Sequence, residues 1–128
     1  MDPMKTHGAF SWCELMTPNT KAAADFYHQL FGWNLQTLDM PGGPYHVVKI
    51  GEAAIAGIMS MPADAAPKMP PHWGCYITVD NADESAAEAQ ALGAKVIVAP
   101  TDVPGVGRFA VLQDPQGAVF SIIDYLDD

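Results

Sequence analysis

The sequence predicts an α+β fold built from two tandem βαβββ modules, and three observations support this prediction. The stretches that begin at Cys13 and at Cys75 have the same order of features: an apolar strand, an Asn/Asp turn, an Ala-rich helix, a Gly stop and another strand. Apolar residues between Lys21 and Phe31 recur with helical period, and the remaining apolar runs are short and separated by turn residues. Two copies are too few for a solenoid. We therefore expect a pseudo-symmetric pair of curved, cup-like, mostly antiparallel sheets with the helices on the outer face.

The first module is expected over about residues 8–60 of a single domain, 1–128. Its elements should be a strand, a helix and three strands, over 9–16, 21–31, 33–38, 45–50 and 53–59. Thr20 is the N-cap candidate of the helix, and Gly32 should end it in a left-handed conformation. The expected core-facing side of the helix comprises Ala23, Phe26, Tyr27, Leu30 and Phe31.

A Pro-rich linker is expected over 61–71, because proline sustains neither a helix nor a central strand. The second module follows over about residues 72–125 and repeats the order of the first. Its expected elements are 73–79, 82–92, 95–98, 108–113 and 118–124. Between the last two strands, Asp114-Pro-Gln-Gly117 is typical of a tight turn, since Pro presets φ and Gly supplies a positive φ.

Composition excludes some classes of function. The 128 residues carry a net charge of −9, and the six Lys and Arg residues are scattered, whereas nucleic-acid binding needs clustered cations. No run of eighteen apolar residues exists, so we expect no membrane span. The first residues lack the apolar core of a signal peptide, which favours a cytoplasmic protein. Cys13 and Cys75 are expected to be buried, inert thiols rather than a disulfide.

Several motifs resemble those of the vicinal-oxygen-chelate superfamily, which includes glyoxalase I, bleomycin-resistance proteins and extradiol dioxygenases. They are Phe26-Tyr27 with Leu30-Phe31-Gly32-Trp33, then Val79-Asp80-Asn81, and finally Asp114-Pro-Gln-Gly117. The tracts 69–73 and 103–112 resemble a bacterial, glyoxalase-like subgroup with no assigned reaction. The resemblance covers almost the whole chain and implies the βαβββ fold, with a homodimer as the common assembly.

The resemblance also implies where a metal would bind. In metal-dependent members each module supplies two ligands, one from its first strand and one from its last. The matching positions here are Trp12, Gly74, Ser121 and Gly57 (or the adjacent Ala56). Trp and Gly offer no useful lone pair, and a lone Ser hydroxyl is a poor ligand for divalent metals. We therefore predict no metal site and no cofactor.

Strand alternation assigns the candidate site residues to the concave face of the sheet. Glu14 is the candidate catalytic residue, because a carboxylate on an apolar strand is expensive to bury without a role. It could equally be a structural carboxylate bonded to backbone N–H groups or to Arg108. The candidate ligand-binding residues are Trp12, Glu14, His72, Tyr76, Ser121 and Arg108. For each, an ordinary structural role is the alternative: His72 as a solvated edge residue, Arg108 as the partner of Asp102, and Trp12 or Tyr76 as filling of the cup.

These features favour a metal-independent protein that binds a small apolar or aromatic molecule, by sequestration or as an accessory binding module. The first alternative is an enzyme, either a lyase, isomerase or dioxygenase-type enzyme that uses Glu14 with Tyr76 or His72, or a metal enzyme with unrecognised ligands. The second alternative is a structural or interaction protein with a filled cup. The expected partners are a small molecule and a second copy of the chain, with neither nucleic acid nor membrane.

Overall fold

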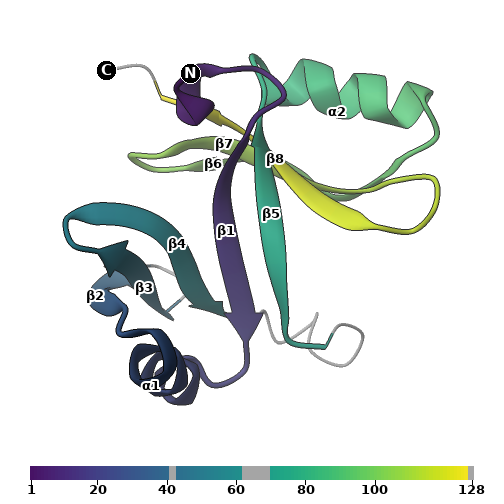
Figure 1. Ribbon diagram of the computed structural model, residues 1–128. Coiled ribbons are helices and arrows are strands. Elements are labelled where there is room, and N and C mark those ends of the chain that lie inside the picture. The colour runs from purple at the N-terminus through teal and green to yellow at the C-terminus, as the bar shows by residue number, and fades with distance from the viewer. Residues whose placement is uncertain (41–42, 62–69, 127–128) are drawn as a thin grey trace. The chain divides into compact units, whose positions relative to one another are not determined.

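The computed structural model describes residues 1–40, 43–61 and 70–126 and contains two copies of a βαβββ unit, preceded by a short 3-10 helix, Pro3–Lys5 (Figure 1). The first copy comprises β1 (Phe10–Thr17), α1 (Thr20–Phe31), β2 (Asn34–Met40), β3 (Gly43–Ile50) and β4 (Ala53–Ser60). The second comprises β5 (His72–Thr78), α2 (Ala82–Ala91), β6 (Lys95–Val103), β7 (Gly107–Gln113) and β8 (Val119–Tyr125). The predicted α+β class and the predicted repeat are confirmed.

Both copies have the same strand pairing. The strand order is β2-β3-β4-β1 in the first copy and β5-β8-β7-β6 in the second. The first strand of each copy pairs parallel with its last strand, and the other pairs are antiparallel. A parallel pair needs a long crossover connection, which the helix and the two intervening strands supply here. The sheets are therefore mostly antiparallel, as predicted.

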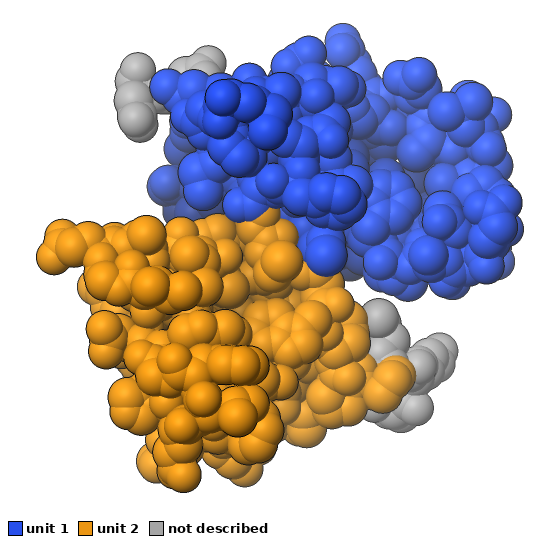
Figure 2. Space-filling view, in the orientation of Figure 1, with its two compact units in different colours: residues 1–11, 75–128 blue, residues 12–74 orange. Residues whose placement is uncertain are grey.

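The chain divides into two compact units (Figure 2): unit 1 comprises residues 1–11 and 75–128, and unit 2 comprises residues 12–74. The N-terminal segment belongs with the second half of the sequence, because Gly8 N–H donates to the Thr78 carbonyl at 2.7 Å and Thr78 N–H donates to the Ala9 carbonyl at 2.8 Å. The hydroxyls of Ser11 and Tyr125, 2.7 Å apart, add a side-chain bond. Of the predicted linker, residues 62–69 lie outside the described residues.

Each unit has its own apolar core between helix and sheet. In unit 2 the buried residues are Leu15, Val48, Ala56 and Ile58, with Ala23, Tyr27, Trp33 and Leu35 packed against them. In unit 1 they are Val79, Ala82, Ala86, Ala110, Leu112 and Ile122, with Ala89, Val96 and Phe120 packed against them. Leu15 and Ile122 directly follow Glu14 and Ser121, which strand alternation assigns to the concave face, so the same alternation accounts for these two core positions.

The ends of α1 follow from side-chain and glycine chemistry. The N-cap is Asn19 rather than Thr20, since Asn19 Oδ1 accepts the Ala22 N–H at 3.0 Å. At the other end Gly32 has φ 74°, as predicted, and its N–H donates to the His28 carbonyl at 2.8 Å. The prediction was therefore wrong by one residue at the start of the helix and right at its end.

The predicted core-facing side of α1 is only partly covered. Ala24 is buried, and Ala23 and Tyr27 pack against the core, but Phe26, Leu30 and Phe31 are each 58% exposed. The expectation that all five apolar residues face the core was wrong for these three. The helical period identifies an apolar side but cannot tell how much of it the sheet covers.

The prediction that both cysteines are buried is also wrong, because Cys13 and Cys75 are exposed. The reason lies in the placement of the helices. Helix α1 packs mainly on β2, β3 and β4, and α2 packs mainly on β6, β7 and β8. Helix α1 therefore does not cover β1 at Cys13, and helix α2 does not cover β5 at Cys75.

Strand β6 extends five residues past the predicted end, through Pro100 to Val103. Proline is tolerated there because β6 lies at the edge of the sheet, and the pairing with β7 shifts register between Val96 and Val98 and again between Val98 and Thr101. The turn at Asp114 is as predicted: its carboxylate accepts the N–H groups of Gln116 and Ala118, and Gly117 has φ 100°. Within the described residues, neither helix has the length and apolarity to cross a membrane.

Candidate functional site

Glu14 lies in the middle of β1 and is 7% exposed, so its carboxyl group is buried. Removing a carboxylate from water is costly unless hydrogen bonds replace the lost hydration. Glu14 has such a bond, since the Tyr45 hydroxyl of β3 donates to its Oε2 at 2.7 Å. This distance is typical of a hydroxyl bonded to a carboxylate.

The same hydroxyl also joins Trp12 to the pair. Trp12 Nε1–H donates to the Tyr45 oxygen at 3.1 Å, so the indole, the phenol and the carboxylate form one chain of hydrogen bonds. Each bond in such a chain polarises the next and strengthens it. Trp12 and Glu14 are two residues apart on β1, which places both side chains on one face of the strand.

The position of Tyr45 depends on a glycine in the neighbouring strand. Gly57 of β4 is paired with Glu14 in the parallel β1–β4 register and with Val47 in the antiparallel β3–β4 register. A Cβ atom built at Gly57 would overlap the hydroxyl of Tyr45. Only a residue without a side chain leaves room for the phenol there. We call Trp12, Glu14, Tyr45 and Gly57 the Glu14 site.

The Glu14 site lies on the face of the sheet opposite α1. Leu15 and Ile58, the neighbours of Glu14 and Gly57 in sequence, pair with each other and belong to the core beneath α1. Side chains alternate between the two faces of a strand, so Glu14 and Gly57 face away from that core. The buried carboxyl group is therefore separate from the packing that holds α1.

His72, the third candidate in unit 2, begins β5, and its Nδ1 lies 2.8 Å from the Pro70 carbonyl. A carbonyl only accepts, so this nitrogen carries a proton and Nε2 remains for other contacts. Among the described contacts none joins His72 to Glu14. The structure thus brings Trp12 and Glu14 together and shows no bond between either of them and His72.

Unit 1 holds three further candidates. Tyr76 of β5 and Ser121 of β8 are direct neighbours in the parallel register, and Ser121 is buried. The ring of Tyr76 lies 6.5 Å from that of Phe109, tilted by 55°. Unit 1 therefore has an aromatic pair, Tyr76 and Phe109, next to the buried hydroxyl of Ser121. Tyr76 and Ser121 lie on the first and last strands of the second βαβββ copy.

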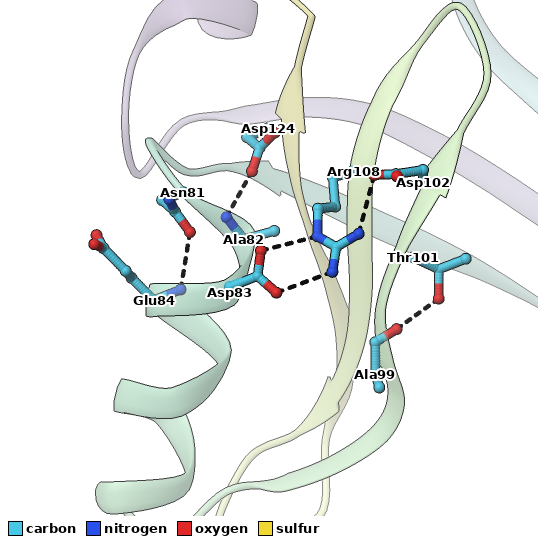
Figure 3. Close-up of polar contacts among 9 residues, drawn as sticks. All are labelled: Asn81, Ala82, Asp83, Glu84, Ala99, Thr101, Asp102, Arg108 and Asp124. Carbon is cyan, nitrogen blue, oxygen red and sulfur yellow. Dashed lines mark hydrogen bonds and ion pairs between the residues drawn. The ribbon is translucent and has the colours of Figure 1, made fainter.

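The third of these candidates, Arg108 of β7, is held by two carboxylates of the same unit (Figure 3). Its Nε and Nη2 donate to the two oxygens of Asp83 at 2.9 and 3.0 Å, and its Nη1 donates to Asp102 at 3.0 Å. The hydrogen bond from Arg108 lowers the pKa of Asp83, and the bonds from both carboxylates raise the pKa of Arg108. The alternative in which Arg108 pairs with Asp102 is the one these bonds support, with Asp83 as a second partner.

The start of α2, next to this cluster, is capped by two acceptors. Asn81 Oδ1 accepts the Glu84 N–H at 3.0 Å, and Asp124 Oδ2 accepts the Ala82 N–H at 2.6 Å (Figure 3). Both satisfy backbone donors that the helix itself leaves unpaired. The polar groups of this region thus have structural partners, and Arg108 helps to join α2 to the β6–β7 hairpin.

The residues at the family's metal positions do not fit a metal ion. Trp12 and Gly57 supply no ligand atom in unit 2, and the space above Gly57 is taken by Tyr45, whose hydroxyl bonds the nearest carboxylate. Among the described residues, no group of three or more His, Cys, Asp and Glu side chains comes close enough to hold a metal ion. We derive no chemical step through a metal.

Tyr45 is the site residue that the sequence analysis missed. The signal was Gly57, a lone glycine within an apolar strand, which commonly marks a place where another group approaches the backbone closely. The sequence does not tell which group approaches, because Tyr45 reaches Gly57 only through the β3–β4 register. That register became known with the structure.

Comparisons with known proteins agree on the fold. The family model described as Glyoxalase/Bleomycin resistance protein/Dioxygenase superfamily matches residues 9–122. Among solved structures, a hypothetical protein from Bacillus halodurans covers 96% of this chain and 98% of its own length, with a TM-score of 0.72 and 17% identity. Methylmalonyl-CoA epimerase from Mycobacterium tuberculosis covers 96% of this chain and 92% of its own, with a TM-score of 0.65 and 13% identity. Likeness at such low identity concerns the fold alone.

Two curated proteins are more similar in sequence. "Putative glyoxylase CFP32" of Mycobacterium bovis is 44% identical over 117 residues, which make up 91% of this chain and 44% of that protein. "Anthracycline biosynthesis protein DnrV" of Streptomyces peucetius is 34% identical over 127 residues, 90% of this chain and 46% of that protein. The chain therefore spans less than half the length of either relative.

Proposed function

The chain belongs to the Glyoxalase/Bleomycin resistance protein/Dioxygenase superfamily, and from that premise we propose that it binds a small, largely apolar or aromatic molecule without the help of a metal ion. The observation that carries the proposal is the buried Glu14 carboxyl group, hydrogen-bonded to Tyr45 on the sheet face away from α1. Small-molecule sites combine apolar and aromatic walls with a few placed polar groups, and the Glu14 site has this composition.

The chemistry of the Glu14 site favours a planar ligand that carries a hydroxyl group. The rings of Trp12 and Tyr45 are rigid, flat and amphipathic, so they suit stacking on another ring. The carboxylate of Glu14 accepts hydrogen bonds, so it would bind a phenolic or alcoholic O–H of the ligand. The relative named for anthracycline biosynthesis supports this class, since an anthracycline is a fused aromatic system with hydroxyl groups.

In this proposal the protein acts by sequestration or as an accessory binding module, and it works as a cytoplasmic homodimer. Two exposed cysteine side chains suit a reducing compartment. Tyr76 and Ser121 of unit 1 and His72 of unit 2 remain candidate ligand contacts. Arg108 is a weaker candidate, because Nε, Nη1 and Nη2 of its guanidinium group all donate to carboxylates of the chain itself.

The test is a titration of the protein with 1,8-dihydroxyanthraquinone, followed by tryptophan fluorescence and by calorimetry. We expect saturable binding that survives dialysis against a chelator. Glu14→Gln should weaken binding about tenfold or more, since a lost hydrogen bond to a charged group costs roughly 1.5–3 kcal/mol. The control is Glu52→Gln, which changes an exposed glutamate of the same unit. Absence of saturable binding, loss of binding after chelation, or equal affinity in both variants would each contradict the proposal.

A second candidate function is proton-transfer catalysis, which the 2.7 Å bond between Tyr45 and Glu14 favours. A buried carboxylate and a phenol in contact can accept and return a proton, with Tyr76 or His72 as further partners from the sequence analysis. An assay with methylglyoxal and glutathione separates the two functions. Binding alone predicts no turnover, with or without added nickel or zinc. Turnover that disappears in Glu14→Gln while ligand affinity is kept would favour the enzyme.

A further inference from the structure

Helix α1 presents large apolar side chains to solvent at its C-terminal end. Phe26, Leu30 and Phe31 are each 58% exposed, and Trp73 of β5 is 38% exposed. A contiguous patch of large apolar side chains on a protein surface is often a functional interaction site. Phe26, Leu30 and Phe31, with the neighbouring Tyr27, fall within one side of the helix at 3.6 residues per turn.

The exposed residues belong to a set of aromatic rings that pack against one another. The ring of Tyr27 lies 4.9 Å from Phe26, 5.6 Å from Trp33 and 5.4 Å from Trp73, and its hydroxyl accepts the Trp73 Nε1–H at 3.1 Å. The ring of Phe31 lies 5.0 Å from that of Trp33, tilted by 34°. We call Phe26, Tyr27, Leu30, Phe31, Trp33 and Trp73 the aromatic surface. Because its rings already hold one another in place, little side-chain entropy remains to be lost when a partner docks.

The exposed apolar area of the aromatic surface is large enough to form the centre of a protein interface. A phenylalanine or tryptophan side chain contributes about 150–250 Å² when fully exposed, so the exposed fractions amount to roughly 300–400 Å² of apolar area. A stable interface buries about 800 Å² on each partner, with an apolar centre inside a polar rim. Aromatic residues dominate the binding energy at such centres.

The charge of α1 is compatible with a second copy of the chain as the partner. The whole chain carries a net charge of −9, yet α1 holds one lysine and one aspartate, and these bind each other, Lys21 Nζ to Asp25 Oδ2 at 3.2 Å. In a two-fold pair a surface meets an identical one, so a surface whose charges are all of one sign opposes like charges, whereas a neutral surface does not. Helix α2 carries three acidic residues and no lysine or arginine; Asp83 is bonded to Arg108, and Glu84 and Glu88 would oppose the same carboxylates of a second copy.

We propose that the aromatic surface is the place where a second copy of this chain docks, helix α1 against helix α1 across a two-fold axis. The proposal rests on the homodimer put forward under the proposed function and names the residues that form it. A partner of opposite charge would be drawn to the acidic parts of the chain. The neutral, aromatic side of α1 is suited to a second copy of the same acidic protein.

The test measures mass by sedimentation equilibrium at micromolar concentrations. The wild type should have twice the 13.7 kDa mass of one chain. Leu30→Glu places one charge on each side of the two-fold axis, and we expect it to raise the dimer dissociation constant at least a hundredfold. The matched control is Ile50→Glu, which changes an apolar residue of the same unit with 59% exposure, and which should remain a dimer. Circular dichroism verifies that both variants are folded.

Each outcome decides the proposal. A wild type that is a monomer would overturn both the homodimer and this surface. A dimer that survives in Leu30→Glu would overturn the surface and leave the homodimer standing. If Leu30→Glu fails to fold, Phe26→Lys, one helical turn earlier, is used instead. Its mass is measured by sedimentation equilibrium and compared with the monomer and dimer masses in the same way. Affinity for 1,8-dihydroxyanthraquinone is measured separately, so failure of the ligand proposal is recognised independently of the mass.

Discussion

The hydroxyl group of Tyr45 occupies the place where a side chain at Gly57 would begin. The two residues lie on adjacent antiparallel strands, offset by two positions, and the phenol crosses from β3 to reach β1. The glycine thus allows Tyr45 to bond both Trp12 and Glu14. The resemblance to metal-dependent members led us to expect a ligand position at Gly57, and in this chain the Tyr45 phenol fills the space beside that glycine.

The first prediction is that Gly57→Ala destabilises the protein and displaces Tyr45. An added methyl group in a packed site forces neighbours to move and typically costs about 1–3 kcal/mol of unfolding free energy. Urea denaturation of wild type and variant measures this loss. Gly74→Ala is the control, because its Cβ would meet the Glu14 carbonyl oxygen at 3.9 Å, an ordinary contact. Equal losses in both variants would show that Gly57 has no special role.

The second prediction concerns the hydroxyl of Tyr45 alone. Tyr45→Phe removes a donor to the buried Glu14 carboxyl group and an acceptor of the Trp12 N–H, so we expect a loss of about 1–3 kcal/mol in unfolding free energy. Tyr27→Phe serves as the comparison, since the Tyr27 hydroxyl accepts one hydrogen bond, from Trp73, in an exposed position. When an exposed hydrogen bond is removed, water can take the place of the lost partner, so Tyr27→Phe should lower the unfolding free energy by less than Tyr45→Phe does. A smaller loss at Tyr45 than at Tyr27 would contradict the assigned network.

Much of the fold could be predicted from the sequence because its signals are local. Gly32 ends α1 where its φ of 74° requires glycine, and Asp114 folds its turn through its own carboxylate. The repeat predicted the order of strands and helix along the chain in each copy. What failed depends on distant packing: the exposure of Cys13 and of Phe26 follows from how far each helix covers its sheet.

In the candidate site, too, local relations could be predicted from the sequence and relations between distant residues could not. Glu14 and Trp12 were predicted together because they share one strand face, and the structure joins them through Tyr45. Tyr45 itself was missed because its contact with Gly57 depends on the β3–β4 register, which is a relation between strands. Arg108 could be predicted as a partner of Asp102, which is close in sequence, but its stronger bidentate contact is with Asp83 of α2.

The third prediction tests the N-cap of α1. Asn19→Ala removes the acceptor of the Ala22 N–H and should lower the unfolding free energy by about 0.5–2 kcal/mol. Thr20→Ala is the matched control, because Thr20 is already the first residue of the helix, where alanine is a good helix former. Thermal or urea unfolding of both variants gives the comparison. A larger effect at Thr20 than at Asn19 would restore the cap that the sequence predicted.

The fourth prediction is a pH dependence of stability that arises from Asp83. Arg108 lowers the pKa of this carboxyl group in the folded protein below its ordinary value of 3.8. A lowered folded pKa means that the unfolded chain binds the proton first as the pH falls. The pair therefore contributes its full stability above the unfolded pKa and loses it as the pH falls through the lower folded pKa.

The measurement is the unfolding free energy of wild type and Asp83→Asn between about pH 6 and pH 2, at low and high salt. The wild type should be the more stable at the upper end, and the difference should shrink toward acid and in high salt. Asp25→Asn is the control, since the side chains of Asp25 and Asp83 have nearly equal exposure, 60% and 59%. Asp25 binds one flexible lysine, whereas Asp83 accepts two hydrogen bonds from Arg108, from Nε and Nη2. A difference that stays constant down to pH 2, or that is no larger for Asp83→Asn than for Asp25→Asn, would mean that the Arg108 cluster does not hold α2 to the β6–β7 hairpin.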